Sequence, residues 1–138
     1  ATSLKFTNST ASYLRLADSA DWDFGSGDFT IDCWINVHTI GANGEGIMGC
    51  IASGWGFIVQ GSAYGTVGAI KVYSGAAWIT TTTEIVPLDT WTHIAVVGKA
   101  GVVKVAVNGV FSGTPATSAM DNAGKTTRDP STCGPLLG

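Results

Sequence analysis

The stretch that decides the fold is residues 91–110, WTHIAVVGKAGVVKVAVNGV. Valine, isoleucine and threonine crowd both halves of it, and side chains branched at Cβ favour strands over helices. The halves are joined by the turn sequence GKAG at residues 98–101, and Asn108-Gly109 favours the positive φ angles that a tight hairpin turn requires. In the first half both alternating sets of residues are apolar, so both faces of that strand should be covered. We predict the central hairpin of a two-layer β protein.

Composition places the chain in the all-β class. Charged residues make up only 12% of it, and its glycine content is about twice ordinary usage. No long window carries apolar residues at helical spacing. A chain of 138 residues has the size of one domain and can bury a core without the help of disulfide bonds or metal ions. We therefore predict one all-β domain over residues 1–138.

The charge distribution argues against two classes of partner. The net charge is −3 and the seven basic residues are scattered along the chain. Nucleic-acid binding requires a concentrated basic surface, so nucleic acid is not an expected partner. The longest apolar runs cover only a few residues, far short of a membrane-crossing segment. We expect no insertion into a membrane.

The cysteines are Cys33, Cys50 and Cys133, an odd number that cannot all pair within the chain. No C-x-x-C spacing, typical of metal sites, occurs. Cys33 shares an alternating apolar face with Phe29 and Ile31, which favours a buried free thiol over a bridge to Cys50. The cysteines therefore do not decide between an oxidising and a reducing compartment.

Short strands and turns alternate along the rest of the chain, which is typical of a sandwich or jelly roll. The predicted strands cover residues 3–7, 12–17, 28–38, 47–52, 55–60, 67–73 and 77–82, with an extension of the hairpin at 110–113. In the first two, alternation directs Leu4, Phe6, Leu14 and Leu16 inward. Residues 114–138 contain three of the four prolines and little alternation, so we predict an irregular C-terminal segment there.

Four motifs follow one another in order along residues 3–113. They are Leu4 with Phe6, residues 13–18 (YLRLAD), residues 24–34 (FGSGDFTIDCW), and residues 91–109, which begin WTHIA and end in Asn-Gly. In this order they resemble the concanavalin A-like lectin/glucanase domains of the laminin-G and pentraxin kind. The resemblance implies a jelly-roll sandwich of two antiparallel sheets, one of them concave. It also implies that Trp22 and Trp91 plug the core.

The chain departs from that family in two ways. The usual closing segment, which returns beside the first strand, is missing after residue 113, and Ala95 replaces the cysteine with which Cys33 would pair in pentraxins. A sandwich without its closing strand leaves backbone N–H and C=O groups unpaired at a strand edge. We therefore expect that residues 114–138 cover this edge, or that two copies of the chain pair across it as a homo-oligomer.

Catalysis and metal binding find little support in the sequence. Glycoside hydrolysis needs paired carboxylates, and the glucanases of this fold carry them as E-x-D-x-x-E, which is absent here. Asp32 has no carboxylate partner at the required spacing, so we predict that the protein is not an enzyme. Asp18, Asp21 and Asp23 form a D-x-x-D-x-D loop that is a candidate Ca²⁺ site. Structural turns are the favoured role of these aspartates, and we expect no cofactor.

Aromatic side chains are the better lead to function. Sugar rings present apolar C–H faces that stack on indole and phenol rings. Trp78 and Tyr73 are the aromatic residues most expected to reach solvent, and Trp34 lies beside Asp32 on the polar face of its strand. For Trp34 and Trp55, packing between the sheets is an equal alternative. The threonines at 80–83 either supply hydroxyls to a ligand or form an exposed strand face, and His93 is expected to fill a half-buried strand position.

Together with the resemblance, these features predict a non-catalytic module that binds carbohydrate or glycoconjugate. The predicted ligand-binding residues are Trp78, Tyr73, Asp32, Trp34 and Trp55. The alternative is a structural or adhesion domain of a larger extracellular or virus-like assembly with no small ligand. Either function favours an extracellular or surface-associated location.

Overall fold

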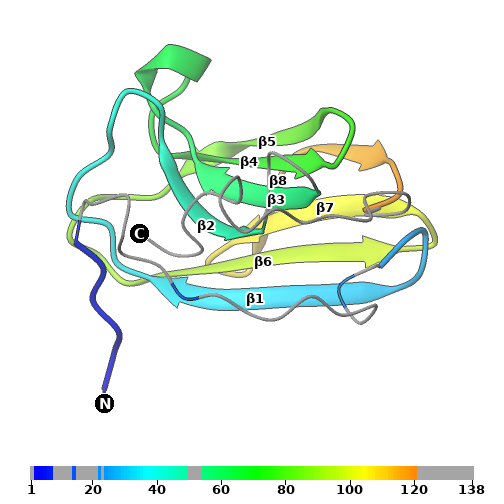
Figure 1. The fold of residues 1–138 in the computed structure, drawn as a ribbon, viewed down its shortest axis with the longest axis horizontal. Helices are drawn as coiled ribbons and strands as arrows, with labels where there is room; N and C mark the ends of the chain where they lie inside the picture. Colours follow the sequence, from blue (N-terminus) through cyan, green and yellow to red (C-terminus); the bar gives the residue numbers. More distant parts are fainter. Residues whose placement is uncertain (1, 8–13, 15–21, 23, 50–53, 121–138) are drawn as a thin grey trace.

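The protein is a sandwich of two antiparallel four-strand sheets (Figure 1). The computed structural model describes residues 2–7, 14, 22, 24–49 and 54–120. The first sheet has the order β1-β6-β7-β8 and the second has the order β2-β3-β4-β5. The strands of the first sheet are β1 (Phe29–Ile35), β6 (Thr92–Lys99), β7 (Val102–Val107) and β8 (Val110–Thr117). Those of the second are β2 (Glu45–Gly49), β3 (Trp55–Val59), β4 (Ala69–Ser74) and β5 (Trp78–Ile85), with the short 3₁₀ turn η2 (Ser62–Tyr64) before β4.

The predicted central hairpin is confirmed as β6 and β7. Its turn places Ala100 at φ 49° and Gly101 at φ 74°, and the next turn places Asn108 at φ 50° and Gly109 at φ 79°. Two successive positive φ angles match the right-handed twist of the flanking strands. The Asn-Gly pair therefore sets the β7–β8 connection, as its sequence predicts.

The core lies between the two sheets. From the first sheet it takes alternate residues of β6 and β7, and from the second sheet it takes residues of β3 and β4. These buried side chains are Ile94, Val96, Val103, Val105, Val107, Phe57, Val59, Ile70 and Val72. Period-two alternation puts each set on one face of its strand. The all-β sandwich is thus built as the sequence pattern predicts.

Side-chain hydrogen bonds join the two sheets along one edge, where β5 approaches β8. Ser112 Oγ accepts hydrogen bonds from the backbone N–H groups of Thr83 at 3.0 Å and Glu84 at 2.8 Å. Thr80 Oγ1 donates to the carbonyl of Thr114 at 2.7 Å. Thr82 is also buried and bonded within the fold. The hydroxyls of Thr80 and Thr82 therefore stabilise the sandwich through internal hydrogen bonds. These two residues neither offer hydroxyls to a ligand nor form an exposed strand face, so both sequence-based interpretations are wrong for them.

Several local predictions are wrong. Residues 2–7 form no strand, and the side chain of Leu4 is exposed because no ladder turns it inward. Leu14 is exposed too, whereas the other residues of the predicted strand 12–17 lie outside the described residues. Trp91 does not plug the core, because Thr92 takes the first inward position of β6 and alternation directs Trp91 outward.

The start of the C-terminal segment differs from the prediction as well. Strand β8 continues to Thr117, so the irregular region does not begin at residue 114. The chain then returns to pair Met120 with Gly25, just before β1, through N–H to O bonds of 3.1 and 2.9 Å. Met120 is fully buried and packs into the core. The expectation that residues 114–138 cover the edge of the first strand stays a prediction, because residues 121–138 lie outside the described residues.

Two wider features concern membrane crossing and metal binding in the described part of the chain. No helix there is long and apolar enough to cross a membrane. No group of three or more His, Cys, Asp or Glu side chains there could hold a metal ion. Asp18, Asp21 and Asp23, the candidate Ca²⁺ ligands, lie outside the described residues.

Candidate functional site

The structure separates the predicted ligand-binding residues into three places. Trp55 is only 4% exposed and packs in the core, with its indole N–H donating to the carbonyl of Trp22 at 2.7 Å. Packing between the sheets is therefore the interpretation that holds for Trp55, and no surface ligand can stack on it. Tyr73 and Trp78 lie on the outer face of the second sheet. Asp32 and Trp34 lie on the outer face of β1, on the opposite side of the sandwich, so no single site unites all five.

A groove of about 610 Å³ lies at the end of the sandwich where β1 ends and β2 begins. Its floor includes Ile47 and Val59, and residues 2–6 line one side. Cavities of roughly 300–1,000 Å³ are typical of small-ligand sites. We call this cavity the Trp34 groove, because it runs beside the side chain of Trp34.

Two tryptophans give the Trp34 groove its exposed aromatic surface. Trp34 is 62% exposed and Trp91 is 50% exposed. Trp34 pairs with His93 across β1 and β6, and their ring centroids lie 5.2 Å apart. Trp91 stands two residues before His93, where alternation directs it to the same side of the sheet. Packing between the sheets is therefore excluded for Trp34, and both indoles are accessible to a ligand.

Polar groups surround these rings. His93 Nε2 lies 3.0 Å from the Asp32 carboxylate. The backbone of His93 is held by Asn108, whose side-chain oxygen accepts from the His93 N–H at 2.9 Å while its own N–H donates to the His93 carbonyl at 2.8 Å. The Asn-Gly turn therefore fixes the position of His93, and through it the orientation of the Asp32 carboxylate.

Two further acceptors line the Trp34 groove itself. Glu45 Oε1 accepts from the backbone N–H of Gly41 at 2.8 Å, which orients this carboxylate. The amide oxygen of Asn36 is buried and has no hydrogen-bond partner among the described residues. Buried polar atoms nearly always find a partner, so the Asn36 oxygen is an acceptor in need of a donor. A ligand hydroxyl in the groove is one such donor.

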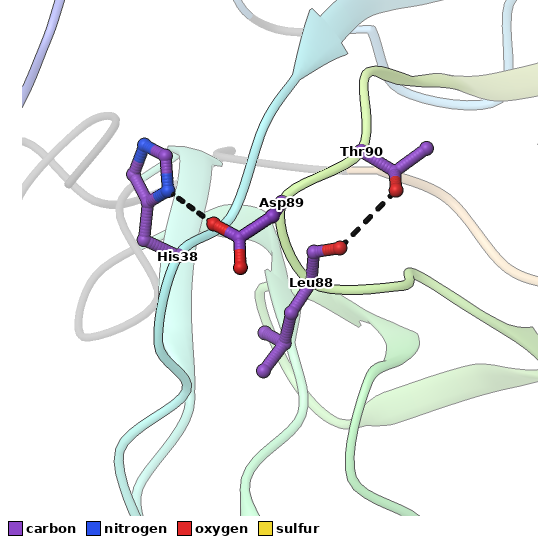
Figure 2. A network of polar contacts seen from close by, with 4 residues as sticks. All are labelled: His38, Leu88, Asp89 and Thr90. Atoms are coloured by element: carbon purple, nitrogen blue, oxygen red, sulfur yellow. Dashed lines mark hydrogen bonds and ion pairs between the residues drawn. The ribbon is translucent and has the colours of Figure 1, made fainter.

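The wall of the groove at residues 36–39 is fastened to the segment before β6 (Figure 2). His38 Nδ1 lies 2.6 Å from the Asp89 carboxylate, and the backbone N–H of Asp89 donates to the carbonyl of Val37 at 2.8 Å. Val37 and Leu88 also form a parallel bridge. Both members of the ion pair are exposed, so it stabilises little by itself, and the backbone contacts carry the fastening.

A second aromatic cluster lies on the outer face of the other sheet. Tyr73 and Trp78 are cross-strand partners whose rings meet edge-on at 5.3 Å, and the ring of Tyr64 lies 6.4 Å from that of Trp78. The ammonium of Lys71 lies over the rings of Tyr64 and Trp78. Sequence reasoning named Tyr73 and Trp78 as ligand-binding but missed Lys71, although Lys71 shares their face at a spacing of two residues.

The thiol on β1 does not add reactivity to the site. Cys33 is a half-buried free cysteine, as predicted. Burial, assisted by the neighbouring Asp32 carboxylate, raises the pKa of the Cys33 thiol to about 11. A thiol with such a pKa is almost entirely protonated at neutral pH and is a poor nucleophile.

Comparison with known proteins agrees with this architecture. Residues 8–135 match the family model described as the concanavalin A-like lectin/glucanases superfamily. Among solved structures, the chain resembles the crystal structure of a "putative carbohydrate binding protein" from Bacteroides ovatus, with a TM-score of 0.54 and 18% sequence identity. The alignment covers 68% of this chain but only 28% of that one, and this identity supports a shared fold alone. No curated protein matches the chain. Because the family model spans nearly the whole sequence and the two-sheet sandwich agrees with it, the chain belongs to the concanavalin A-like lectin/glucanases superfamily.

Proposed function

We propose that this domain binds carbohydrate without catalysis, and that the Trp34 groove holds the sugar. The observation that carries the proposal is the pairing of two exposed indoles with an unpartnered acceptor, the Asn36 oxygen, in one cavity. Sugars combine apolar C–H faces with many hydroxyl donors, so they suit a site that offers flat aromatic surfaces and fixed acceptors. The Bacteroides ovatus protein that the chain resembles is described as a "putative carbohydrate binding protein", which supports the same class of ligand.

The spacing of the groove residues suits one sugar ring packed against Trp34. Asp32 precedes Trp34 by two positions on β1, so alternation directs both side chains to the outer face. Asn36 follows the end of β1 and lines the groove together with Trp34. A ring stacked on the Trp34 indole therefore lies between the groove and the outer face that carries Asp32. The indole of Trp91 then extends the aromatic surface toward the next sugar unit.

The arrangement of acidic groups favours binding over hydrolysis. The Asp32 carboxylate is bonded to His93, and the Glu45 carboxylate is bonded to a backbone N–H. Both carboxylates therefore lie within hydrogen-bond distance of a partner in the fold. A glycosidase needs a pair of carboxyl groups that flank the scissile bond at a set separation, whereas Glu45 lines the groove and Asp32 does not. These contacts suit carboxylates that accept hydrogen bonds from sugar hydroxyls.

The test is a glycan-array screen of the purified domain, followed by calorimetric titration of any hit. We expect Trp34→Ala to weaken binding about tenfold or more, since it removes the stacking surface. The control is Val67→Ala, because Val67 is an exposed apolar residue on a loop outside the groove. An array without hits, or a hit that Trp34→Ala binds as tightly as the wild type, would contradict the proposal. Repeating the screen with Ca²⁺ and with a chelator tests whether a cation takes part.

A structural or adhesion domain is the second candidate. The observation in its favour is the exposure of Val110 and Phe111, which are adjacent apolar residues at the start of β8. Alternation directs these two neighbours to opposite faces of β8, and Phe111 lies in the same cross-strand row as Asp32 on the outer face of the first sheet. A partner protein that covers this face would bury Phe111. An array without hits, combined with a stable oligomer that Phe111→Ser dissociates in sedimentation equilibrium, would favour this candidate.

A further inference from the structure

The aromatic cluster on the second sheet has a fixed geometry. Lys71 and Tyr73 point outward from β4, because Ile70 and Val72 between and beside them are buried in the core. Trp78 lies opposite Tyr73 at the start of β5, and Tyr64 comes from the η2 turn. We call these four residues the Lys71 cluster.

The turns that carry the Lys71 cluster are held in place. Ser74 is buried, and its hydroxyl accepts from the backbone N–H groups of Ala76 and Ala77 at 3.4 and 3.3 Å. These bonds close the turn between Tyr73 and Trp78. On the other side Gly65, at φ 121°, lies so close to the buried Gln60 amide that a Cβ there would approach Nε2 to 2.8 Å. Glycine therefore suits this turn, because a larger residue would have to displace the Gln60 side chain.

The ammonium of Lys71 lies over both neighbouring rings. Its Nζ is 4.9 Å from the centroid of Trp78 and 5.5 Å from that of Tyr64. Aromatic faces attract a cation, so the ammonium stays beside the rings. In the part of the chain that the structure describes, no carboxylate forms an ion pair with it, since the ion pairs found there belong to His38 and His93. The N–H groups of the ammonium that do not face the rings can therefore donate to solvent or to a ligand.

We propose that the Lys71 cluster is a second saccharide site, selective for sugars that carry an anionic group such as a carboxylate or a sulfate ester. The inference rests on the proposed carbohydrate-binding function and adds a separate site with its own ligand class. Trp78 is 36% exposed and Tyr64 is 47% exposed, so both present surface to the C–H face of a sugar ring. The anionic group of the sugar then meets the Lys71 ammonium through a charge-assisted hydrogen bond.

The location of the cluster gives it a distinct role. It lies on the outer face of the second sheet, whereas the Trp34 groove lies at the end of the sandwich, and Trp34 itself is on the outer face of β1 in the first sheet. A net charge of −3 also gives the chain no general attraction for polyanions. Retention by an acidic polysaccharide therefore points to a local cation such as Lys71, and two separate sites allow one domain to bridge two polysaccharide chains.

The experiment measures retardation of the purified domain in native gels that contain polygalacturonate, dextran sulfate or neutral dextran. We expect one or both acidic polymers, but not dextran, to retard the wild type. Lys71→Gln should weaken this retention about tenfold, because it removes one charge-assisted contact. The matched control is Lys104→Gln, which removes an exposed lysine that lies 5.6 Å over the ring of Phe111 on the other sheet. It should leave the retention unchanged.

The outcomes separate this proposal from the function proposed above. Retention that Lys71→Gln and Trp78→Ala both weaken, and that Trp34→Ala leaves intact, supports a second site whatever the glycan array shows. Equal loss in Lys71→Gln and Lys104→Gln would show general charge attraction and overturn the proposal. No retention by either acidic polymer would also overturn it. Lys71→Gln changes an exposed end of a side chain, so the test does not depend on Trp78→Ala remaining folded, and thermal midpoints verify both variants.

Discussion

Replacing Thr82 with valine tests how the threonine run stabilises the sandwich. The β4–β5 register shifts between Ala69 and Lys71, which leaves the Ile70 N–H outside the regular ladder. Thr82 Oγ1 accepts from this N–H at 2.8 Å and donates to the carbonyl of Glu84 at 2.6 Å. Ile70 and Thr82 are both buried, so water cannot take the place of the lost hydroxyl at Ile70.

The magnitude follows from which groups lose a partner. Valine keeps the shape of threonine but leaves the Ile70 N–H buried and unsatisfied, which costs about 1–3 kcal/mol. The carbonyl of Glu84 belongs to an exposed residue, so we add no cost for it. For a domain of this size, 1 kcal/mol lowers the thermal midpoint by about 3–4 °C. We therefore expect Thr82→Val to lower the midpoint by roughly 3–12 °C.

The assay is thermal and urea unfolding, both followed by tryptophan fluorescence, together with hydrogen exchange of the Ile70 amide. Thr81→Val is the matched control, because Thr81 is the next residue and is only partly buried. It should change the free energy of unfolding by less than about 0.5 kcal/mol. If Thr82→Val is as stable as the wild type and the Ile70 amide still exchanges slowly, the hydroxyl does not hold the register shift and the reasoning is refuted.

Three further outcomes are expected. The first concerns Cys33 in a variant whose other two cysteines are replaced by serine. At pH 8 Cys33 should react with iodoacetamide about 100-fold more slowly in the folded than in the urea-unfolded chain, because a pKa near 11 lowers its thiolate fraction. Equal reaction rates would contradict the raised pKa. Gly98→Ala should destabilise the fold by about 1–3 kcal/mol in urea unfolding, since a Cβ there would lie 2.1 Å from the Phe29 ring; a neutral result would mean that the ring shifts freely. Trp55→Ala should cost about 3–5 kcal/mol, whereas Trp91→Ala should leave stability nearly unchanged, because only Trp55 is in the core; similar losses would contradict the outward position of Trp91.

Part of the candidate site was predictable from the sequence. Alternation along β1 put Asp32 and Trp34 on one face, and the place of Tyr73 just before the turn residues Ser74-Gly75 made it an expected surface residue. Local rules could not show that Asp32 and Trp34 lie on a different sheet from Tyr73. They also could not distinguish an exposed indole from a buried one, so Trp34, Trp55 and Trp91 were each open to both interpretations or assigned to the wrong one.

The sequence by itself determined the central hairpin, the two tight turns and strands with clear alternation such as β1. These depend on short-range properties, namely β-branching, period-two alternation and the positive φ angles that Asn-Gly and Ala-Gly adopt. The tertiary structure alone decided which distant segments meet: Asn36 with Glu45 in the Trp34 groove, Lys71 with the rings of Tyr64 and Trp78, and Ser112 with the backbone of β5. The physical reason is that alternation fixes which residues of a strand share a face, whereas the packing of one sheet on the other fixes what that face contacts.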